Sequence, residues 1–535
     1  MVSDRRPRRY VRDAGLLAMM ATAVLGGGVT FGGCSLHQDG VRPPDNRIFF
    51  PGGATIEGAG PGLGRWLYVV NSNSDLRYNA GTIVAVDLIA ARNDYQAVGA
   101  DGLTAWGICS NPDTRYVPPA NVAEAERCCW DILDQNILNC DEQKYIRRER
   151  SVRIGSFGGR PVTQQLHRAS GGERLFVPVR GDVAIDMIEV GATADDVTFL
   201  CTGARANPDN PPARFAICDP NWRITRRDDP LNTTSTVNIP DDQVLRLPDE
   251  PYALAVDDAL ELLYVGHLRG GSVSLINLGS GIGEKAPELL NVYAGLVPPD
   301  ANGSQGVTSL TIREKTGCSG PVYVSSRYSP VVGSFVIAGL DNSSCNPGNP
   351  NGPPGDRSIA IVGTGQIMST GLSGAETRGI EFVSAGQDAA GQALGADRAF
   401  ILQRTPPALV AIDVATQVPF ATIEVCQSPT NLVKQTDAAG RTVALFVTCF
   451  DAGEVYVIDP WTPRVRTVIP IGRGPVATVL PPAGAAPSEA TRAYVVGFGA
   501  NNVAVVDLDP NSRTQYRVIQ RIGFPSPTPR EVGPQ

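Results

Sequence analysis

Apolar and polar positions alternate along most of the chain in short runs that are separated by turns. Residues 494–508 show the unit: the aromatic-led run Tyr-Val-Val-Gly is followed by the turn Phe-Gly-Ala-Asn-Asn and by Val-Ala-Val-Val-Asp-Leu. A period of two is typical of a β-strand that buries one face. The unit therefore predicts two antiparallel strands joined by a turn.

The same aromatic-led run occurs seven times along the chain. The runs contain Tyr68, Phe176, Tyr264, Tyr323, Phe400, Phe446 and Tyr494. In five units the following strand ends in an acid or its amide, at Asp87, Asn277, Asp413, Asp459 and Asp507. Further strands are expected before the aromatic run, as at 251–256, 378–383 and 476–481, and after the acidic run, as at 152–155, 466–472 and 516–523. One four-stranded unit cannot bury its own faces, so the pattern predicts an all-β chain folded as a seven-bladed β-propeller of four-stranded antiparallel blades.

The repeated unit resembles the YVTN family of β-propeller repeats. Tyr68-Val69-Val70-Asn71 and Phe446-Val447-Thr448-Cys449 stand where the family has Tyr-Val-Thr-Asn, and an ending similar to its Val-Ile-Asp follows downstream. The resemblance covers residues 47–525 and implies a propeller there, followed by a C-terminal tail at 526–535. It leaves the activity open, because one fold serves many functions.

The early units are longer than the late ones. The aromatics of the last three units lie close together, at positions 400, 446 and 494, whereas the first two lie at 68 and 176. The extra residues predict loop insertions between third and fourth strands, at about 89–150, 191–242 and 340–357. The first insertion holds a predicted helix over 121–133, with Asn121 as its N-cap.

The first 34 residues are predicted to be a targeting segment. An Arg-rich stretch precedes an apolar run that begins at Ala14, and Phe31-Gly32-Gly33-Cys34 then resembles a bacterial lipobox, although Leu is usual where Phe31 stands. The resemblance implies that Cys34 carries a diacylglycerol anchor; the alternative is an ordinary signal peptide. Ser35 after the cysteine implies the outer membrane, at its periplasmic or cell-surface face. The export route, Sec or Tat, and the leaflet stay open.

Residues 35–46 are polar, contain two prolines and are expected to form a flexible tether. No other apolar run reaches the roughly 20 residues that a membrane-spanning helix needs. Membrane contact is therefore expected through the N-terminal lipid only.

Ten cysteines remain once Cys34 is set aside, an even number in an exported chain, which favours disulfides. Three pairs are expected from their positions in the propeller: Cys201 with Cys218, Cys318 with Cys345, and Cys426 with Cys449. On the predicted helix, neighbouring side chains point about 100° apart. Cys128 and Cys129 are therefore expected to reach Cys109 and Cys140, in either order.

A metal site would need closely spaced cysteines with histidine support, but the chain has no Cys-x-x-Cys, and its histidines are His37, His167 and His267. No metal and no cofactor are predicted. The net charge of −8 and the pI of about 5.2 do not suit a nucleic-acid partner. A monomer is expected.

Propeller ligands usually meet the axial funnel, which the loops after the second strands line. The residues three and four positions after each aromatic include the polar side chains of Asn71, Arg180, His267, Arg327 and Arg404. Arginine recurs at one offset in three units, and its planar fork of donors suits an anionic ligand such as an acidic glycan. The alternative is that these arginines merely lie at turns in water.

The sequence favours a lipid-anchored module of the cell envelope that binds or scaffolds a protein or glycan partner. The alternative is a hydrolase or lyase with a site in the axial funnel. Gly-x-Ser-x-Gly, Walker and His-Glu-x-x-His motifs are absent, so no catalytic residue is assigned. A third possibility is that the insertions, and not the funnel, hold a protein partner.

Overall fold

A computed structural model describes residues 40–524 except 59–62, 98–105, 111–127, 167–171, 194–195, 202–217, 219–221, 227–243, 279–286, 314–319, 339–359, 387–394, 438 and 483–484. A compact unit begins at Val41, whose carbonyl accepts a 3.0 Å hydrogen bond from the Asn79 amide. Residues 41–46, expected in the tether, therefore belong to this unit.

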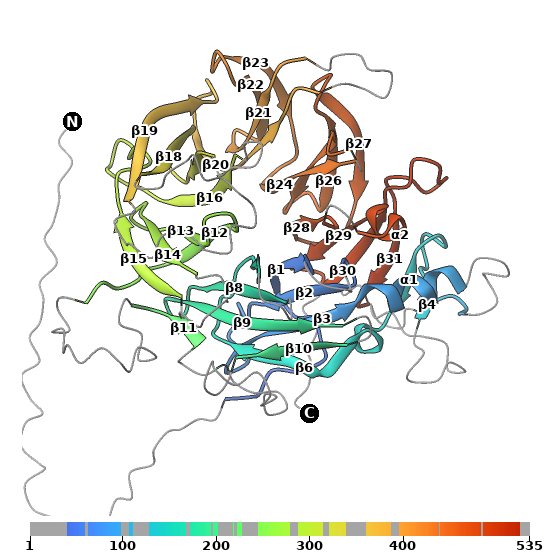
Figure 1. Ribbon diagram of the computed structural model, residues 1–535. Helices are drawn as coiled ribbons and strands as arrows, with labels where there is room; N and C mark the ends of the chain where they lie inside the picture. The colour runs from blue at the N-terminus through green and yellow to red at the C-terminus, as the bar shows by residue number, and fades with distance from the viewer. Residues whose placement is uncertain are drawn as a thin grey trace, which may run out of the picture. The chain divides into compact units, whose positions relative to one another are not determined.

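Seven antiparallel sheets follow one another along the compact unit and stand around a common axis (Figure 1). They are called blades 1 to 7 in chain order. The first four strands of each blade run in chain order from the axis outward, so the predicted seven-bladed propeller is confirmed.

The strands occupy four equivalent positions. The inner strands are β1 (Pro51–Ile56), β7 (Val162–Gln165), β12 (Pro251–Asp257), β16 (Val307–Ile312), β20 (Ala375–Val383), β24 (Pro429–Thr436) and β28 (Pro475–Val479). The second strands are β2 (Trp66–Asn71), β8 (Glu173–Val179), β13 (Leu262–His267), β17 (Val322–Ser326), β21 (Arg398–Thr405), β25 (Thr442–Cys449) and β29 (Arg492–Gly497). The third strands are β3 (Gly81–Asp87), β9 (Ala184–Ala192), β14 (Val273–Asn277), β18 (Val331–Ala338), β22 (Ala408–Asp413), β26 (Glu454–Asp459) and β30 (Asn502–Asp507). The outer strands are β6 (Ile146–Ile154), β10 (Val197–Leu200), β15 (Glu288–Tyr293), β19 (Ala360–Ser369), β23 (Pro419–Glu424), β27 (Arg464–Pro470) and β31 (Val518–Ile522).

The seven predicted aromatic-led runs are the second strands, and their aromatic side chains are all buried. Several of these rings pack against the next blade. The Tyr264 ring lies 5.4 Å from that of Phe335 in blade 4, and the Tyr323 ring lies 4.6 Å from that of Phe382 in blade 5. The aromatic position thus joins neighbouring blades, because large rings bury much apolar area on the face of a sheet.

The acid that ends the third strand caps the turn that follows. Asp413 Oδ1 accepts hydrogen bonds from the Thr416 amide (2.8 Å) and hydroxyl (2.9 Å), and Asp459 Oδ1 accepts from the Trp461 amide at 2.9 Å. A carboxylate that bonds the backbone two or three residues later stabilises a turn locally. This explains why the repeat ends in an acid.

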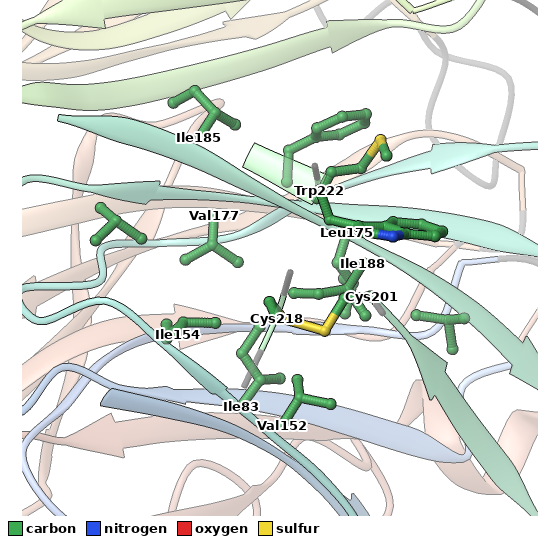
Figure 2. Packing of buried hydrophobic residues seen from close by; sticks show 14 of the residues in the cluster. Ile83, Val152, Ile154, Leu175, Val177, Ile185, Ile188, Cys201, Cys218 and Trp222 are labelled. Carbon is green, nitrogen blue, oxygen red and sulfur yellow. A yellow bond between two sulfur atoms is a disulfide. The ribbon is translucent and has the colours of Figure 1, made fainter. Parts of the chain in front are cut away.

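The apolar faces of neighbouring blades form the core. Figure 2 shows the packing between blades 1 and 2, where Ile83 and Val152 of blade 1 belong to one apolar cluster with Leu175 of blade 2. The disulfide between Cys201 and Cys218, with Cα atoms 4.9 Å apart, lies in the same layer. The core is therefore a series of layers between blades.

Two insertions lie where they were expected: residues 88–145 separate β3 from β6, and residues 339–359 separate β18 from β19. The expectation for 191–242 was wrong. In blade 2, β10 follows β9 directly, and β11 (Arg223–Ile224) then pairs with an earlier part of the same strand. The insertion interrupts the outer layer of the blade, because both β10 and β11 pair with β9.

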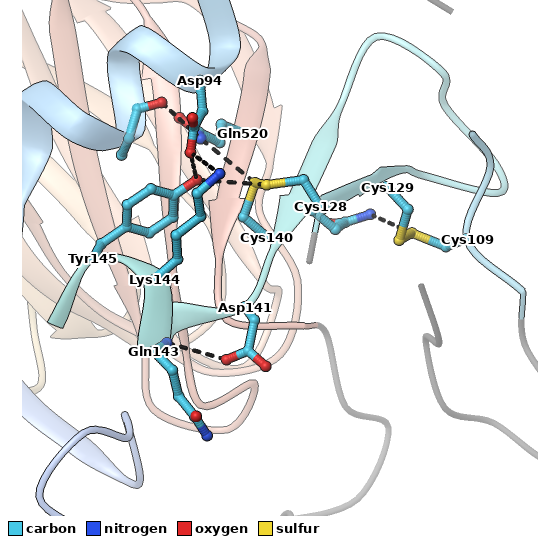
Figure 3. The surroundings of a disulfide bond; sticks show 12 residues. Asp94, Cys109, Cys128, Cys129, Cys140, Asp141, Gln143, Lys144, Tyr145 and Gln520 are labelled. Atoms are coloured by element: carbon cyan, nitrogen blue, oxygen red, sulfur yellow. Dashed lines mark hydrogen bonds and ion pairs between the residues drawn. A yellow bond between two sulfur atoms is a disulfide. The ribbon is translucent and has the colours of Figure 1, made fainter. Parts of the chain in front are cut away.

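The helix predicted over 121–133 is contradicted at its C-terminal end, while 121–127 lie outside the described residues. Cys128–Trp130 form strand β4, which pairs with β5 (Leu138–Cys140). The pairing wins over local helix propensity because Cys128 faces Cys140 directly and is joined to it by a disulfide, with Cα atoms 4.0 Å apart. Adjacent strand residues point to opposite faces, so Cys129 reaches Cys109 instead (Figure 3).

The predicted pair of Cys426 and Cys449 is also present, with Cα atoms 5.8 Å apart. Cys34, Cys318 and Cys345 lie outside the described residues, so the anchor and that pair stay predictions.

The ring closes between blades 7 and 1 by a device that the sequence did not reveal. The described part of the blade 1 insertion comprises α1 (Leu88–Ala97), β4, β5 and a 3-10 helix (Glu142–Lys144), together called the latch. Strand β5 pairs in parallel with β31, so β5 and β4 extend the sheet of blade 7 to six strands. Blade 7 is thereby held by a segment that belongs to blade 1.

Polar contacts reinforce the latch. Arg521 of β31 donates to Asp131 Oδ2 (2.8 Å) and to Asn139 Oδ1 (3.2 Å), and the Gln520 amide donates to the Ala91 carbonyl of α1 at 3.0 Å. Arg92 of α1 forms an ion pair with Glu489 of α2 (Pro487–Ala490). These bonds join the latch to β31 and to α2, which lies between β28 and β29 of blade 7.

Asp131 is nearly fully buried. Burial by itself would raise the pKa of its carboxyl, but hydrogen bonds from the Leu133 amide and the Asn139 side chain and the charge of Arg521 hold the pKa below its usual value. Asp131 is therefore ionised at neutral pH and depends on its partners.

Replacement of Arg521 by alanine should destabilise the protein by about 2–4 kcal/mol, because it leaves the Asp131 carboxylate buried without its cation. Chemical denaturation of the oxidised protein measures this. The control is Arg466→Ala, which breaks the more exposed 3.1 Å pair with Asp459 and should cost less than about 1 kcal/mol. Equal losses in the two variants would contradict the role given to the latch.

Two carboxyls lie between blades 1 and 2. Glu57, just after β1, is fully buried, and Glu173, at the start of β8, is 1% exposed. Burial and the neighbouring Glu173 raise the pKa of Glu57 to about 8, and burial raises the pKa of Glu173 to about 7. The folded state therefore holds protons that the unfolded chain releases.

The free energy of unfolding should consequently fall as pH rises from 6.5 to 8.5, because the folded state binds more protons over this window. Replacement of Glu57 by glutamine should flatten this fall and raise the free energy of unfolding at pH 8.5 by an amount on the order of 2 kcal/mol, with a higher melting temperature. Thermal unfolding at both pH values measures the difference, with Glu424→Gln on the exposed edge of β23 as the control. If the free energy of unfolding of Glu57→Gln falls with pH as steeply as that of the wild type, the Glu57 carboxyl is not the source of the fall.

Candidate functional site

The candidate site lies at the end of the axis where second strands end and inner strands begin; it is called the axial face. There, the residue three positions after each aromatic pairs with an inner-strand residue, as Asn71 does with Pro51. The residue immediately before that inner-strand partner is called the lead-in residue. The lead-in residues of blades 1 to 7 are Phe50, Phe157, Glu250, Gly306, Glu376, Ser428 and Gly474. Six have φ between 42° and 70°, a left-handed backbone that reverses the chain sharply.

The residue four positions after each aromatic is called the turn residue. The turn residues are Ser72, Arg180, Leu268, Arg327, Arg404, Phe450 and Phe498. In every blade except blade 5, the backbone amide of the turn residue donates to the carbonyl of the lead-in residue, over 2.8–3.4 Å. The axial face thus carries two residues per blade at fixed backbone positions.

Asn71 and His267, predicted to face a ligand, are fully buried instead. The Asn71 side chain accepts from the Phe49 amide (3.0 Å) and donates to the Arg47 carbonyl (2.9 Å). It thereby holds the segment that leads into β1. Both residues stand three positions after the aromatic, where the side chain points into the blade.

The His267 imidazole has the same structural role in blade 3. Its Nδ1 lies 3.2 Å from the Asp249 carbonyl and its Nε2 lies 2.8 Å from Ser274 Oγ. Burial lowers the pKa of His267 to about 4, despite hydrogen bonds to the backbone that raise it. The ring is neutral and enclosed at neutral pH, so it does not offer a base to a ligand.

Two other residues at this position have the same role: Gln403, which was not predicted as a site residue, and Cys449, whose bond to Cys426 was predicted. Gln403 Oε1 accepts a 2.6 Å hydrogen bond from Thr370, which leads into blade 5, and Cys449 is bonded to Cys426, which leads into blade 6. The signal was available: a polar or sulfur-bearing residue recurs three positions after the aromatic.

Arg180 and Arg404, in contrast, belong to one network on the axial face. The Arg180 guanidinium lies 5.9 Å from the ring of Phe157 and 5.9 Å from the ring of Tyr252. The Tyr252 hydroxyl accepts a 3.2 Å hydrogen bond from Arg378 Nη1. Strand β16 lies between β12 and β20 around the axis. A direct bond between Tyr252 and Arg378 therefore passes in front of β16, so both side chains point toward the axis.

Glu376 completes the network within blade 5. It forms an ion pair with Arg378, and its Oε2 lies 3.6 Å from Arg404 Nη1. Arg327 is partly exposed, and its guanidinium lies 5.3 Å from its neighbour's ring, that of Tyr328. The network thus joins Arg180 and Arg404 through residues that were not predicted. Arg327, the third predicted arginine, packs on Tyr328 in blade 4.

Tyr252 and Arg378 occupy equivalent positions, two residues after the lead-in residue. Both inner strands have a register shift there, between Pro251 and Ala253 and between Thr377 and Gly379. A β-bulge turns a side chain away from the regular alternation of the strand. The bulge explains how these side chains reach across the axial face, and it also explains why a strict period of two did not reveal them.

The electrostatic balance of this network is positive. The network holds three arginines and one carboxylate: Glu376 pairs with Arg378 and Arg404, whereas Arg180 lies against the rings of Phe157 and Tyr252. The Nε of Arg378 is buried without a hydrogen-bond partner. Guanidinium groups that are held by rings and by a carboxylate present oriented donors. The arrangement can bind an anion without a large rearrangement of side chains.

Among the described residues, no group of three or more His, Cys, Asp or Glu side chains is placed to hold a metal ion. In the same part of the chain, no helix is both long and apolar enough to span a membrane.

No protein-family model matches the chain, and no curated protein matches it either. Similar solved structures include a protein from Lactobacillus plantarum, at 12% identity over 71% of this chain and 90% of that one, with a TM-score of 0.41. A 6-phosphogluconolactonase-like protein from Bacteroides fragilis is similar at 11% identity over 70% of this chain and 90% of that one, with a TM-score of 0.40. The dihydro-heme d1 dehydrogenase NirN is similar at 10% identity over 74% of this chain and 61% of that one, with a TM-score of 0.37. Likenesses this distant carry no information about activity or ligand.

Proposed function

We propose that the protein is a binding module of the cell envelope that holds an acidic glycan at the axial face. The observation that carries the proposal is the network from Arg180 through Tyr252, Arg378 and Glu376 to Arg404. It connects blades 2, 3 and 5 across the axis with cationic groups that are already oriented. Binding costs less when the groups that contact a ligand are ordered beforehand.

The charge of the site contrasts with the charge of the chain. The protein has a net charge of −8, yet the network contains three arginines and a single carboxylate, which pairs with two of them. A patch of opposite sign on an acidic protein favours the approach of an anionic ligand. Arginine forks also match the planar carboxylates of acidic sugars.

The alternative of a hydrolase or lyase needs a general acid or base at the same face. Of the histidines, only His267 lies among the described residues, and its enclosed, neutral ring does not supply one. Glu376, the carboxylate of the network, is paired with Arg378 and Arg404. These observations support binding over catalysis.

A protein partner on the insertions is supported less. In the blade 1 insertion, β5 pairs with β31 and α1 bonds to blade 7. Its described residues Arg92, Asp131 and Asn139 bond to blade 7, which leaves the axial face as the better candidate.

Alanine at Arg180, Arg378 or Arg404 should weaken binding of a galacturonic acid hexasaccharide by about 10- to 100-fold each, because a charge-assisted hydrogen bond contributes about 1.5–3 kcal/mol. Calorimetric titration against the wild type measures this, and binding should weaken with added salt. The exposed Arg464 on β27 supplies the matched control, Arg464→Ala, and Arg378→Lys keeps the charge but loses the fork. Equal affinity for the neutral galactose hexasaccharide, or no binding of the acidic one, overturns the proposal.

We further propose that Cys34 carries a lipid that holds the protein at the outer membrane, facing the periplasm or the cell surface. The lipobox-like Phe31-Gly32-Gly33-Cys34 supports this, together with the disulfides Cys128–Cys140 and Cys201–Cys218, which suit an oxidising compartment.

Replacement of Cys34 by alanine should move the protein from the membrane fraction to the soluble envelope fraction, because the acyl chains that anchor it are no longer attached. Fractionation and immunoblotting of cells that express each form measure the shift. Ser35→Ala is the control and should stay with the membrane. A wild-type protein found in the soluble fraction would rule out the anchor.

A further inference from the structure

The turn residues of blades 6 and 7 are both phenylalanine, and so is the lead-in residue of blade 1. The Phe498 ring lies 5.5 Å from the Phe50 ring and 6.1 Å from the Phe450 ring, in edge-on and tilted arrangements. All three side chains are partly exposed. They are called the phenylalanine arc, and they occupy the blades that follow the arginine network around the ring.

Backbone amides hold the arc: Phe450 and Phe498 make the turn bond that Arg180 makes, and Phe50 makes a different one. The amides of Phe450 and Phe498 donate to the carbonyls of Ser428 (3.0 Å) and Gly474 (2.9 Å), and the Phe50 amide donates to Asn501 Oδ1 at 2.7 Å. A Cβ on Gly474 would lie 3.2 Å from the nearest Phe450 ring atom, so glycine makes room for that ring. The arc is therefore built by the fold and is not a chance grouping of loops.

The conformation of Phe50 belongs to the repeated turn. Its φ of 42° lies in the left-handed region, as it does in five other lead-in residues, so the turn itself requires this backbone. In blade 1 the turn places an aromatic ring, partly exposed, beside the Phe498 ring.

We propose that the axial face binds an oligosaccharide that contains uronic acids, with carboxylates on the arginine network and apolar pyranose faces on the phenylalanine arc. This rests on the function proposed above and specifies its ligand. The C–H face of a pyranose matches an aromatic ring, and Glu376 offers an acceptor to sugar hydroxyls beside Arg378 and Arg404. A fatty acid would match the arc and the arginines but has no hydroxyl for that acceptor.

The test compares Phe450→Leu and Phe498→Leu with the wild type, because leucine keeps apolar volume but removes the ring. The probe is the galacturonic acid hexasaccharide, and Phe420→Leu on β23, where Phe420 is 48% exposed, is the matched control. Each arc variant should weaken binding on the order of tenfold, while thermal unfolding without sugar stays unchanged. Saturation-transfer NMR on the wild type should show the strongest transfer at the pyranose C–H protons.

The outcomes separate the two proposals. If Arg180→Ala and Arg404→Ala weaken binding but both leucine variants bind like the wild type, the arc has no part in recognition and this inference is overturned, while the acidic-ligand proposal stands. If the hexasaccharide does not bind the wild type, the proposed function itself fails. If Phe420→Leu weakens binding of the hexasaccharide as much as the two arc variants do, the inference is also overturned.

Discussion

Each blade is a four-stranded sheet with apolar side chains on both faces, so it is stable only when a neighbour covers each face, and the ring has to close. Blades 7 and 1 do not share a strand. Their junction depends on an apolar layer that includes Tyr494 and Val69, on the latch and on the bond from Phe50 to Asn501. The latch therefore acts on the whole ring, and it also holds together the two blades across which the Phe50 and Phe498 rings meet.

The local parts of this fold could be predicted from the sequence. The second strands alternate strictly around a buried aromatic, and the acid after the third strand acts within three residues of itself, as Asp413 does. The latch could not be predicted in the same way. Strands of three residues such as Cys128–Trp130 have too short a pattern to recognise, and they form because β31, almost four hundred residues later, and a disulfide provide partners.

The sequence could predict those site residues whose place depends only on their distance from the aromatic of their own blade. Arg180 and Arg404 stand four residues after their aromatic and do reach the axial face. Asn71 and His267 stand one residue earlier, and a shift of one residue on a strand moves a side chain to the other face. Tyr252 and Arg378 escaped prediction because a bulge sets their direction and because their bond joins blades 3 and 5.

On the axial face, side chains at one position hold the fold, and side chains at the next position are available to contact a ligand. Side chains three positions after the aromatic, such as Asn71 and His267, hold the segment that leads into their blade. In six blades the next residue is held through its backbone amide, as in Arg327 and Phe498, so that bond does not depend on its side chain. The fold therefore tolerates arginine in one blade and phenylalanine in another at the same position. A ring of seven such positions can vary its chemistry blade by blade, because the bonds that maintain the ring do not involve the side chains that vary.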